Sequence, residues 1–288
     1  FSELESLAAS VHTTARWDSQ VRSLLELVEG LEDAEESTEK GTEKASDKGA
    51  KRSSASQKAS RRVIAQRPVP TGLQATLRPY QVEGFQWLSF LYEQRLGGIL
   101  ADDMGLGKTV QALALLAHAI EEHRAASERA ASERTASEHA AGRGESVEPF
   151  APFLVVAPTS VIANWAAEAE RFLPEAKVVT VTETTAGKTP LAERIAGAHL
   201  VLTSYTLLRM DEDAYTGYAR TLGRTVDEST GELSAPEGWG AFLLDEAQFV
   251  KNTGTRAWSI ARAMPARTKI AMTGTPIENN LMELWALL

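Results

Sequence analysis

A glycine-rich stretch, DDMGLGKT at positions 102–109, constrains this chain more than any other part of its sequence. It follows a short apolar run and precedes a segment with helical spacing, which is the strand–loop–helix context of a phosphate-binding loop. Glycines let backbone N–H groups close around phosphate oxygens, and the N-terminus of the following helix adds its positive dipole end. Lys108 would then reach the β- and γ-phosphates of a nucleotide, and the Thr109 hydroxyl would bind Mg²⁺.

The loop departs from the common GxxxxGK[ST] pattern, because Asp102 stands where the first glycine belongs. A plain glycine turn between a strand and a helix is the alternative interpretation, and the flanking segments argue against it. The loop residues predicted to contact the nucleotide are Asp103, Met104, Gly105, Leu106, Gly107, Lys108 and Thr109.

Short apolar runs alternate with segments of helical periodicity through most of the chain. Each run has the length of a strand and the composition of a strand that is buried on both faces. Regular alternation of strand, loop and helix predicts an α/β fold, a parallel sheet with helices on both faces. The predicted strands are residues 98–101, 153–157, 177–181, 200–203, 241–244 and 269–272.

Two adjacent carboxylates, Asp245 and Glu246, follow the apolar run at 241–244. Metal-assisted phosphoryl transfer needs carboxylates beside a phosphate loop. Asp245 would hold Mg²⁺ through water, and Glu246 would orient the attacking water and take its proton. A solvated strand end is the alternative for the pair alone. Together with Lys108, the pair predicts that a magnesium-bound triphosphate occupies one site at a common sheet edge.

Composition divides the chain into further segments. Residues 1–31 have apolar positions at helical spacing and are predicted to be the helical end of a preceding domain. Residues 32–67 have few apolar side chains and are predicted to be a disordered linker, which leaves 68–288 for the α/β domain. The tandem AASER repeats within 121–149 predict a surface insertion, either an extension of the preceding helix or a loose chain. A second loop excursion is predicted at 222–238.

The chain carries a formal net charge of −9 and contains no cysteine. The lack of cysteine excludes disulfides and thiolate metal sites. No apolar stretch is long enough to span a bilayer, so we expect an intracellular protein without a membrane partner. Proteins that hold DNA through broad electrostatics usually have a basic face. This chain is acidic on average, so any prediction of DNA binding must come from its motifs.

The order of motifs along the chain resembles that of superfamily two helicases. Within this superfamily, the chain most resembles the switch/sucrose-non-fermenting (SWI/SNF-type) family of helicase-like DNA translocases, and among them the bacterial-type members. An aspartate at position 102 is normal for this family. The resemblance covers residues 77–288 and implies a RecA-like fold, the first of two ATPase lobes. The motifs that carry it are LRPYQ at 77–81, GF at 84–85, WL at 87–88, LADDMGLGKT at 100–109, APTSVIANW at 157–165, LTSY at 202–205, DEAQ at 245–248, TGTPIENN at 273–280 and ELW at 283–285.

The resemblance also implies roles for matching residues. Gln81 would bind the adenine ring through its amide, with Arg78 and Tyr80 beside it, and Gln248 would complete the nucleotide-binding set. Short polar side chains after two strands would contact backbone phosphates of DNA, although such residues also serve as helix caps. These predicted DNA contacts are Pro158, Thr159, Ser160, Thr203, Ser204 and Tyr205.

Three residues at the end of the last predicted strand would couple the γ-phosphate to lobe movement, with a plain turn as the alternative: Thr273, Gly274 and Thr275. Two tryptophans on apolar helical faces, Trp165 and Trp285, are predicted to serve packing.

An ATP-dependent translocase on double-stranded DNA is therefore the expected function, with ATP and Mg²⁺ as cofactors. The family keeps its arginine finger and half of its DNA track in a second lobe, so we expect this chain alone to bind nucleotide and hydrolyse it slowly. The alternatives are a strand-separating DNA or RNA helicase and an ATP-gated nucleic-acid binding module. RNA polymerase or nucleoid proteins are candidate partners. We expect the protein to be a monomer that is located in the cytoplasm and associated with the nucleoid.

Overall fold

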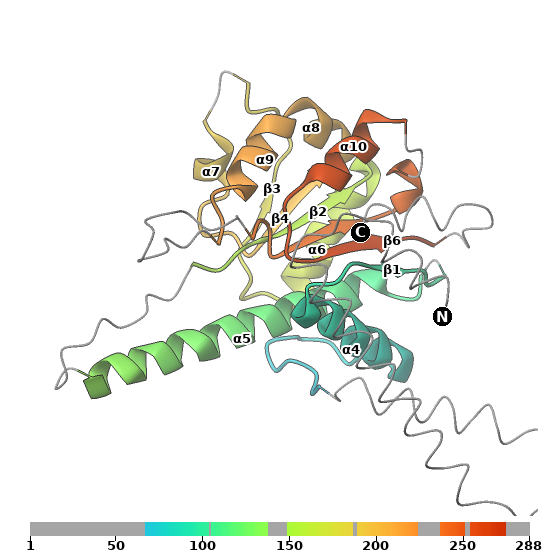
Figure 1. The fold of residues 1–288 in the computed structure, drawn as a ribbon. Coiled ribbons are helices and arrows are strands. Elements are labelled where there is room, and N and C mark those ends of the chain that lie inside the picture. The colour runs from blue at the N-terminus through green and yellow to red at the C-terminus, as the bar shows by residue number, and fades with distance from the viewer. Residues whose placement is uncertain are drawn as a thin grey trace, which may run out of the picture. The chain divides into compact units, whose positions relative to one another are not determined.

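Six parallel strands form one sheet in the part of the chain that the structure describes (Figure 1). This computed structural model describes residues 67–103, 105–137, 149–186, 189–223, 237–250 and 254–274. The order across the sheet is β1-β6-β5-β2-β4-β3. The predicted parallel sheet is therefore confirmed. Its strands are β1 (Gly98–Leu100), β2 (Phe153–Ala157), β3 (Val178–Thr180), β4 (Leu200–Ser204), β5 (Ala241–Leu244) and β6 (Lys269–Met272).

Alternate residues of the central strands enter two separate hydrophobic layers, because successive side chains of a strand point to opposite faces. In β2, Phe153 and Val155 belong to one layer, whereas Leu154 and Val156 belong to the other. Every residue of β2, β4 and β5 is buried. This two-sided burial is the reason that these strands are continuous apolar runs in the sequence.

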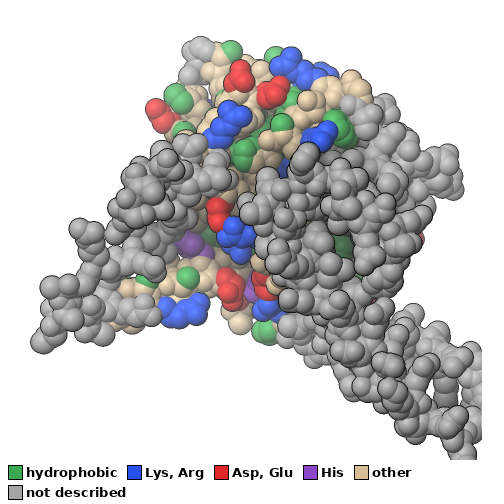
Figure 2. Space-filling view, viewed as in Figure 1, with side chains coloured by type: hydrophobic (Ala, Val, Ile, Leu, Met, Phe, Trp, Pro, Cys, Tyr) green, Lys and Arg blue, Asp and Glu red, His purple; other side chains and the backbone are tan. Residues whose placement is uncertain are grey.

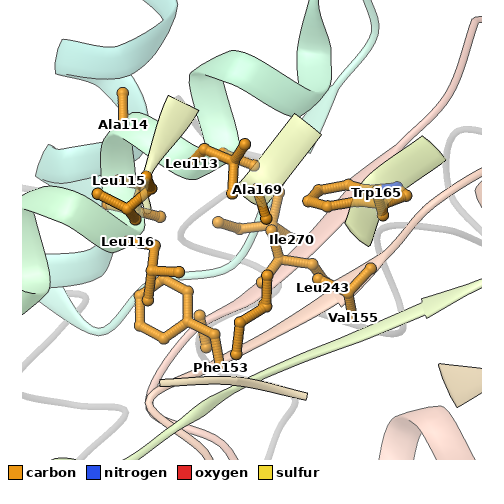
Figure 3. Packing of buried hydrophobic residues seen from close by; sticks show 14 of the residues in the cluster. Leu113, Ala114, Leu115, Leu116, Phe153, Val155, Trp165, Ala169, Leu243 and Ile270 are labelled. Atoms are coloured by element: carbon orange, nitrogen blue, oxygen red, sulfur yellow. The ribbon is translucent and has the colours of Figure 1, made fainter. Parts of the chain in front are cut away.

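Helices cover both faces of the sheet, as the sequence predicted. The first layer is closed by α4 (Pro79–Gln94), the start of α5 (Lys108–Ser137) and α6 (Thr159–Phe172). Figure 3 shows residues of this layer, among them Leu113 of α5 and Trp165 of α6. The second layer is closed by α7 (Leu191–Arg194), α8 (Tyr205–Met210), α9 (Glu212–Ala219), the 3₁₀ helix η1 (Ala247–Val250) and α10 (Arg256–Ala263).

Helix α5 continues well past the sheet that it covers (Figure 1). Its residues from Val110 to Ala119 are buried, and most of its later side chains that the structure describes are exposed. The first part of the predicted insertion at 121–149 is thus an extension of this helix as far as Ser137. The sequence had left helix extension and a loose chain open as alternatives.

Several predictions concern residues outside the described ranges. They are the helical segment 1–31, the linker up to residue 66, residues 138–148 of the insertion, most of the excursion at 222–238, and the single residues Met104, Thr275 and Trp285. Within the described ranges, no helix combines the length and the apolar character needed to cross a membrane.

Lys269 at the start of β6 is a half-buried cation beside the end of α10. Its ammonium donates hydrogen bonds to the carbonyl oxygens of Ala261 at 3.1 Å and Arg262 at 2.6 Å. Burial, with the nearby charge of Arg262, lowers the pKa of Lys269 to about 8 from its ordinary value of 10.5. Between these two pH values the unfolded chain binds more protons than the folded chain, so stability must rise with pH.

We therefore expect Lys269 to make the free energy of unfolding increase between pH 8 and 10.5, by at most about 3 kcal/mol from this group. Urea denaturation of the wild type and Lys269→Met across this range measures the effect, because the variant lacks the titrating group. The difference between the two proteins should shift in favour of the wild type as pH rises. Lys177→Met, at an exposed lysine, is the control, and a pH-independent difference for Lys269→Met would contradict the prediction.

Candidate active site

The carboxyl ends of β1, β6 and β5 lie at one edge of the sheet, where ligands bind in open α/β folds. β1 leads into the loop that ends at Lys108, β6 leads into Thr273, and β5 leads into Asp245 and Glu246. The structure therefore brings the phosphate-loop candidate and the two carboxylates to a common edge. β6 lies between β1 and β5, so Thr273 is located between the two halves of the site.

The loop before α5 is closed by its own lysine. The Lys108 ammonium donates hydrogen bonds to the carbonyl oxygens of Asp102 at 2.8 Å and Asp103 at 3.1 Å. Gly105 and Gly107 have φ angles of 83° and 78°, which side chains rarely adopt. A Cβ at Gly107 would come within 2.5 Å of the Gln81 amide nitrogen. The loop thus requires glycine at this position both for its backbone conformation and for the close approach of Gln81.

Gln81 connects the start of α4 to the loop. Its Oε1 accepts a hydrogen bond from the Arg78 backbone N–H at 2.9 Å, and its Nε2 donates to the Leu106 carbonyl at 3.0 Å. The Tyr80 hydroxyl donates to the same Leu106 carbonyl at 3.2 Å. An open cavity of about 500 Å³ begins beside Gln81 and Gly107 and is also lined by Glu168 and Phe172. The predicted adenine-binding residues therefore lie against the loop and next to a cavity.

Gln111, which the sequence analysis did not single out, also holds the loop. Its Nε2 donates to the Asp102 carboxylate at 2.9 Å. A Cβ at Gly84 would overlap Oε1 of Gln111, so the glycine in α4 leaves room for this buried amide. The GF motif at 84–85 marks Gly84 in the sequence. The sequence alone does not indicate that Gly84 leaves room for Gln111.

The carboxylate of Asp245 has a fixed hydrogen-bond donor at each oxygen. The indole Nε1 of Trp165 donates to Oδ2 at 2.8 Å, and the backbone N–H of Glu246 donates to Oδ1 at 2.9 Å. Burial raises the pKa of Asp245, and the charge of Glu246 raises it further, whereas the Trp165 and Glu246 hydrogen bonds and the charge of Lys108 lower it. Asp245 and Lys108 are therefore near enough to interact electrostatically.

Trp165 has a polar contact in addition to its predicted packing role. Its side chain is 1% exposed and belongs to the first hydrophobic layer, as predicted, but its N–H also fixes the orientation of Asp245. A buried tryptophan N–H usually finds an acceptor, and this rule was the signal available in the sequence.

Glu246, Gln248 and Thr273 form a chain of hydrogen bonds across the sheet edge. The Gln248 amide nitrogen donates to Oε2 of Glu246 at 2.7 Å, and the Thr273 hydroxyl donates to Oε1 of Gln248 at 3.3 Å. The backbone N–H of Thr273 donates to the Leu100 carbonyl of β1 at 3.1 Å. Glu246 itself has a positive φ of 50°, an uncommon conformation for a residue other than glycine. Gly274 follows Thr273 directly.

The residues predicted to contact DNA differ in their accessibility. Thr159 and Ser160 are exposed at the start of α6, where Pro158 is the N-cap and no side-chain cap is present. The remaining three residues use their side chains inside the protein. The Thr203 hydroxyl accepts from Tyr215 at 2.7 Å, the Ser204 hydroxyl caps α8 by accepting from Leu207 N–H at 3.2 Å, and the Tyr205 hydroxyl donates to the Asp245 carbonyl at 2.8 Å.

The visible face of the described residues carries basic and acidic side chains interspersed with one another (Figure 2). This face has no basic patch among its visible described residues. The prediction of DNA binding therefore rests on contacts of short polar residues with the phosphate backbone of DNA.

The residues at the sheet edge fit a magnesium–nucleotide complex chemically. Mg²⁺ prefers oxygen ligands, and the Thr109 hydroxyl and the Asp245 carboxylate provide them. Among the described residues other than its chain neighbours, none has a heavy atom within 4 Å of the position that a Cβ at Gly105 would take, so the loop has open space on this side. Lys108 supplies a positive charge for a triphosphate at the start of α5.

Comparison with known proteins identifies relatives over most of the chain. The model of the SNF2-related domain matches residues 80–288. The chain is similar to the chromatin-remodeling ATPase INO80 of Arabidopsis thaliana (37% identity over 228 residues) and of Homo sapiens (34% over 230 residues), covering 76% and 77% of this chain. The match spans only 12% of the length of either relative.

A solved structure extends the comparison to three dimensions. The SWI2/SNF2 ATPase core of Sulfolobus solfataricus in complex with double-stranded DNA matches with a TM-score of 0.53 and 29% identity. The match covers 76% of this chain and 36% of that core. Its RecA-like architecture is the parallel α/β arrangement described above. On the family model, the curated relatives and the fold together, this chain belongs to the SNF2-related family of ATPases.

Proposed function

We propose that this chain is the first ATPase lobe of a motor that moves along double-stranded DNA or remodels protein–DNA complexes. The observation that carries the proposal is the meeting of the Lys108 loop with Asp245 and Glu246 at one edge of the sheet. The relatives named as chromatin-remodeling ATPases and the archaeal core solved with DNA support it.

In this proposal Lys108 leaves the carbonyl oxygens of its own loop and binds the β- and γ-phosphates of ATP. Thr109 and Asp245 hold Mg²⁺, which when bound would neutralise charge on the phosphates. Glu246, held by Gln248, orients the attacking water and accepts its proton. These roles need an ionised Asp245, and a bound cation favours that form against the effect of burial.

Gln81 and its neighbours Arg78 and Tyr80 would bind the base at the cavity beside the loop. Thr273 is hydrogen-bonded to both β1 and Gln248, which suits the proposed role of residues 273–275 in coupling nucleotide state to movement. We also propose that duplex DNA contacts the exposed hydroxyls of Thr159 and Ser160 at the start of α6, whose N-terminal N–H groups favour phosphate.

Replacing Lys108 with alanine tests the nucleotide part of the proposal. The variant loses a charge-assisted contact to phosphate, so we expect affinity for Mg-ATP to fall by about 10–100-fold. Titration of this chain with a fluorescent ATP analogue measures the change. Lys177→Ala is the control, because Lys177 is exposed and its ammonium donates a hydrogen bond to the Ala196 carbonyl, away from the phosphate loop. Equal affinities of Lys108→Ala and wild type would contradict the assignment.

Two finer parts of the proposal need separate tests. Because the chain covers 36% of the archaeal core, we propose that rapid hydrolysis depends on residues of a second lobe. Strong stimulation of hydrolysis by duplex DNA in this chain alone would contradict that dependence. A displacement assay on the full-length protein distinguishes translocation from strand separation. Four further statements stay predictions from the sequence: membership of a bacterial-type group, an ATP-gated binding role, RNA polymerase or nucleoid proteins as partners, and a monomeric state.

A further inference from the structure

Helix α6 carries two side chains that lie near the predicted magnesium ligands, Trp165 at Asp245 and Glu168 at the cavity beside the phosphate loop. Trp165 and Glu168 are three positions apart on this helix, so their side chains lie on the same side of it. Trp165 is fully buried against the first hydrophobic layer, and Glu168 is half-buried at the cavity beside the phosphate loop. The helix follows β2, a strand that contributes neither the loop nor the carboxylate pair.

Trp165 fixes the direction of the Asp245 carboxylate. An indole N–H can only donate a hydrogen bond, so the 2.8 Å contact with Oδ2 leaves no alternative arrangement of donor and acceptor. Oδ1 accepts from the backbone N–H of Glu246 at 2.9 Å. With one donor on each oxygen, the plane of the carboxylate is set, and its remaining lone pairs are available to a cation.

Glu168 has the corresponding relation to Thr109. Glu168 lines the cavity together with Gly107 and Val110, which lie on either side of Lys108 and Thr109 in the sequence. Burial raises the pKa of Glu168, interaction with the Thr109 hydroxyl lowers it, and the charge of Asp245 raises it. A hydroxyl has one hydrogen and two lone pairs. A Thr109 hydroxyl that directs its hydrogen to the Glu168 carboxylate keeps its lone pairs for a cation.

We propose that Trp165 and Glu168 are positioning residues for Mg²⁺, and that one helix, α6, orients the carboxylate and the hydroxyl that bind it. Trp165 acts through Asp245, and Glu168 acts through Thr109. This inference rests on the proposed function, because it concerns the magnesium of the same nucleotide site. Residues that orient metal ligands typically change metal affinity by about 10–100-fold when they are replaced.

The test measures magnesium dependence rather than turnover. A fluorescent ATP analogue is titrated into this chain in EDTA and at a series of Mg²⁺ concentrations. Trp165→Phe and Glu168→Ala should each raise the Mg²⁺ concentration for half-maximal enhancement of binding by about 10–100-fold. Affinity in EDTA should stay within about twofold of the wild type. Glu168→Gln keeps an oxygen that accepts from Thr109 and should recover most of the magnesium response.

Two matched controls separate positioning from packing. Trp239 is as buried as Trp165, but its indole nitrogen has no hydrogen-bond partner among the described residues. Trp239→Phe therefore removes the same volume without a contact to a magnesium ligand. Glu170→Gln alters an exposed carboxylate on the same helix. Both controls should keep the wild-type magnesium dependence. Thermal denaturation in EDTA verifies that each variant is folded.

The outcomes distinguish a failure of the proposed function from a failure of the positioning roles of Trp165 and Glu168. If the wild type shows no magnesium-dependent binding of the analogue, the proposed function fails and this inference fails with it. If the wild type depends on Mg²⁺ and the Trp165 and Glu168 variants match their controls, this inference alone is overturned. An equal loss of affinity in EDTA and in Mg²⁺ would also overturn it, because that loss indicates a general structural role.

Discussion

Replacing Glu246 with glutamine is expected to reduce ATP turnover of the full-length protein by roughly 10²–10⁴-fold, the usual contribution of a general base. Glutamine keeps the size of the side chain and an oxygen that accepts the hydrogen bond from Gln248, but it cannot take a proton from water. Nucleotide affinity should change little, because Glu246 is not assigned to phosphate or magnesium. Steady-state hydrolysis measures the turnover of ATP, and equilibrium binding on the same preparation measures the affinity for ATP.

Glu193→Gln, at an exposed position in α7, is the control for this substitution and should retain full turnover. Turnover of Glu246→Gln close to that of the wild type would remove Glu246 from the mechanism. It would favour the alternative in which ATP acts only as a switch for binding, since a switch has no need of a residue that activates water.

The largest loss of stability is expected from Gly238→Ala. Gly238 has a φ of 81°, and a Cβ at this position would overlap the backbone carbonyl of Pro265. The adjacent Trp239 is paired with the same segment, since its N–H donates to the Pro265 carbonyl at 3.1 Å. Backbone cannot move aside as a flexible side chain can, so we expect the free energy of unfolding to fall by at least about 3 kcal/mol. Urea denaturation monitored by circular dichroism measures the loss.

Gly217→Ala is the matched control and should have the opposite sign. Gly217 lies in α9 with an ordinary helical φ. Apart from its chain neighbours and the nearby backbone of α9, no described residue has a heavy atom within 4 Å of a Cβ placed there. Alanine is the better helix former, so the control should gain about 0.5–1 kcal/mol. Similar stabilities of the two variants would show that the contact between Gly238 and Pro265 does not constrain the fold.

The strands and their parallel arrangement could be predicted from the sequence, because a strand that is buried on both faces is a run of consecutive apolar residues. β2 and β5 are apolar at every position, and β4 begins with three apolar residues. The order of the strands could not be predicted, because nothing local in β6 indicates that it pairs between β1 and β5. The length of α5 was open for a similar reason, since the repeats after Ile120 suit an exposed helix and a loose chain equally.

The candidate site divides in the same way. The Lys108 loop and the Asp245–Glu246 pair are contiguous motifs, so their chemistry is visible in a few letters of sequence. The contact between Trp165 and Asp245 joins positions 80 apart, and no local pattern encodes it. Thr203 was predicted to face DNA, but its hydroxyl accepts a hydrogen bond from Tyr215 inside the protein. A polar residue after a strand does not reveal which partner it has.

The backbone of Glu246 has a consequence for any attempt to engineer this protein. A left-handed conformation at a residue other than glycine costs on the order of 1–3 kcal/mol, and the φ of 50° at Glu246 imposes that cost at the residue proposed to activate water. Glycine at position 246 would relieve the strain and remove the carboxylate in one step. A library selected for heat resistance alone would therefore favour variants that have stopped consuming ATP, so thermostable forms must be screened for activity in parallel.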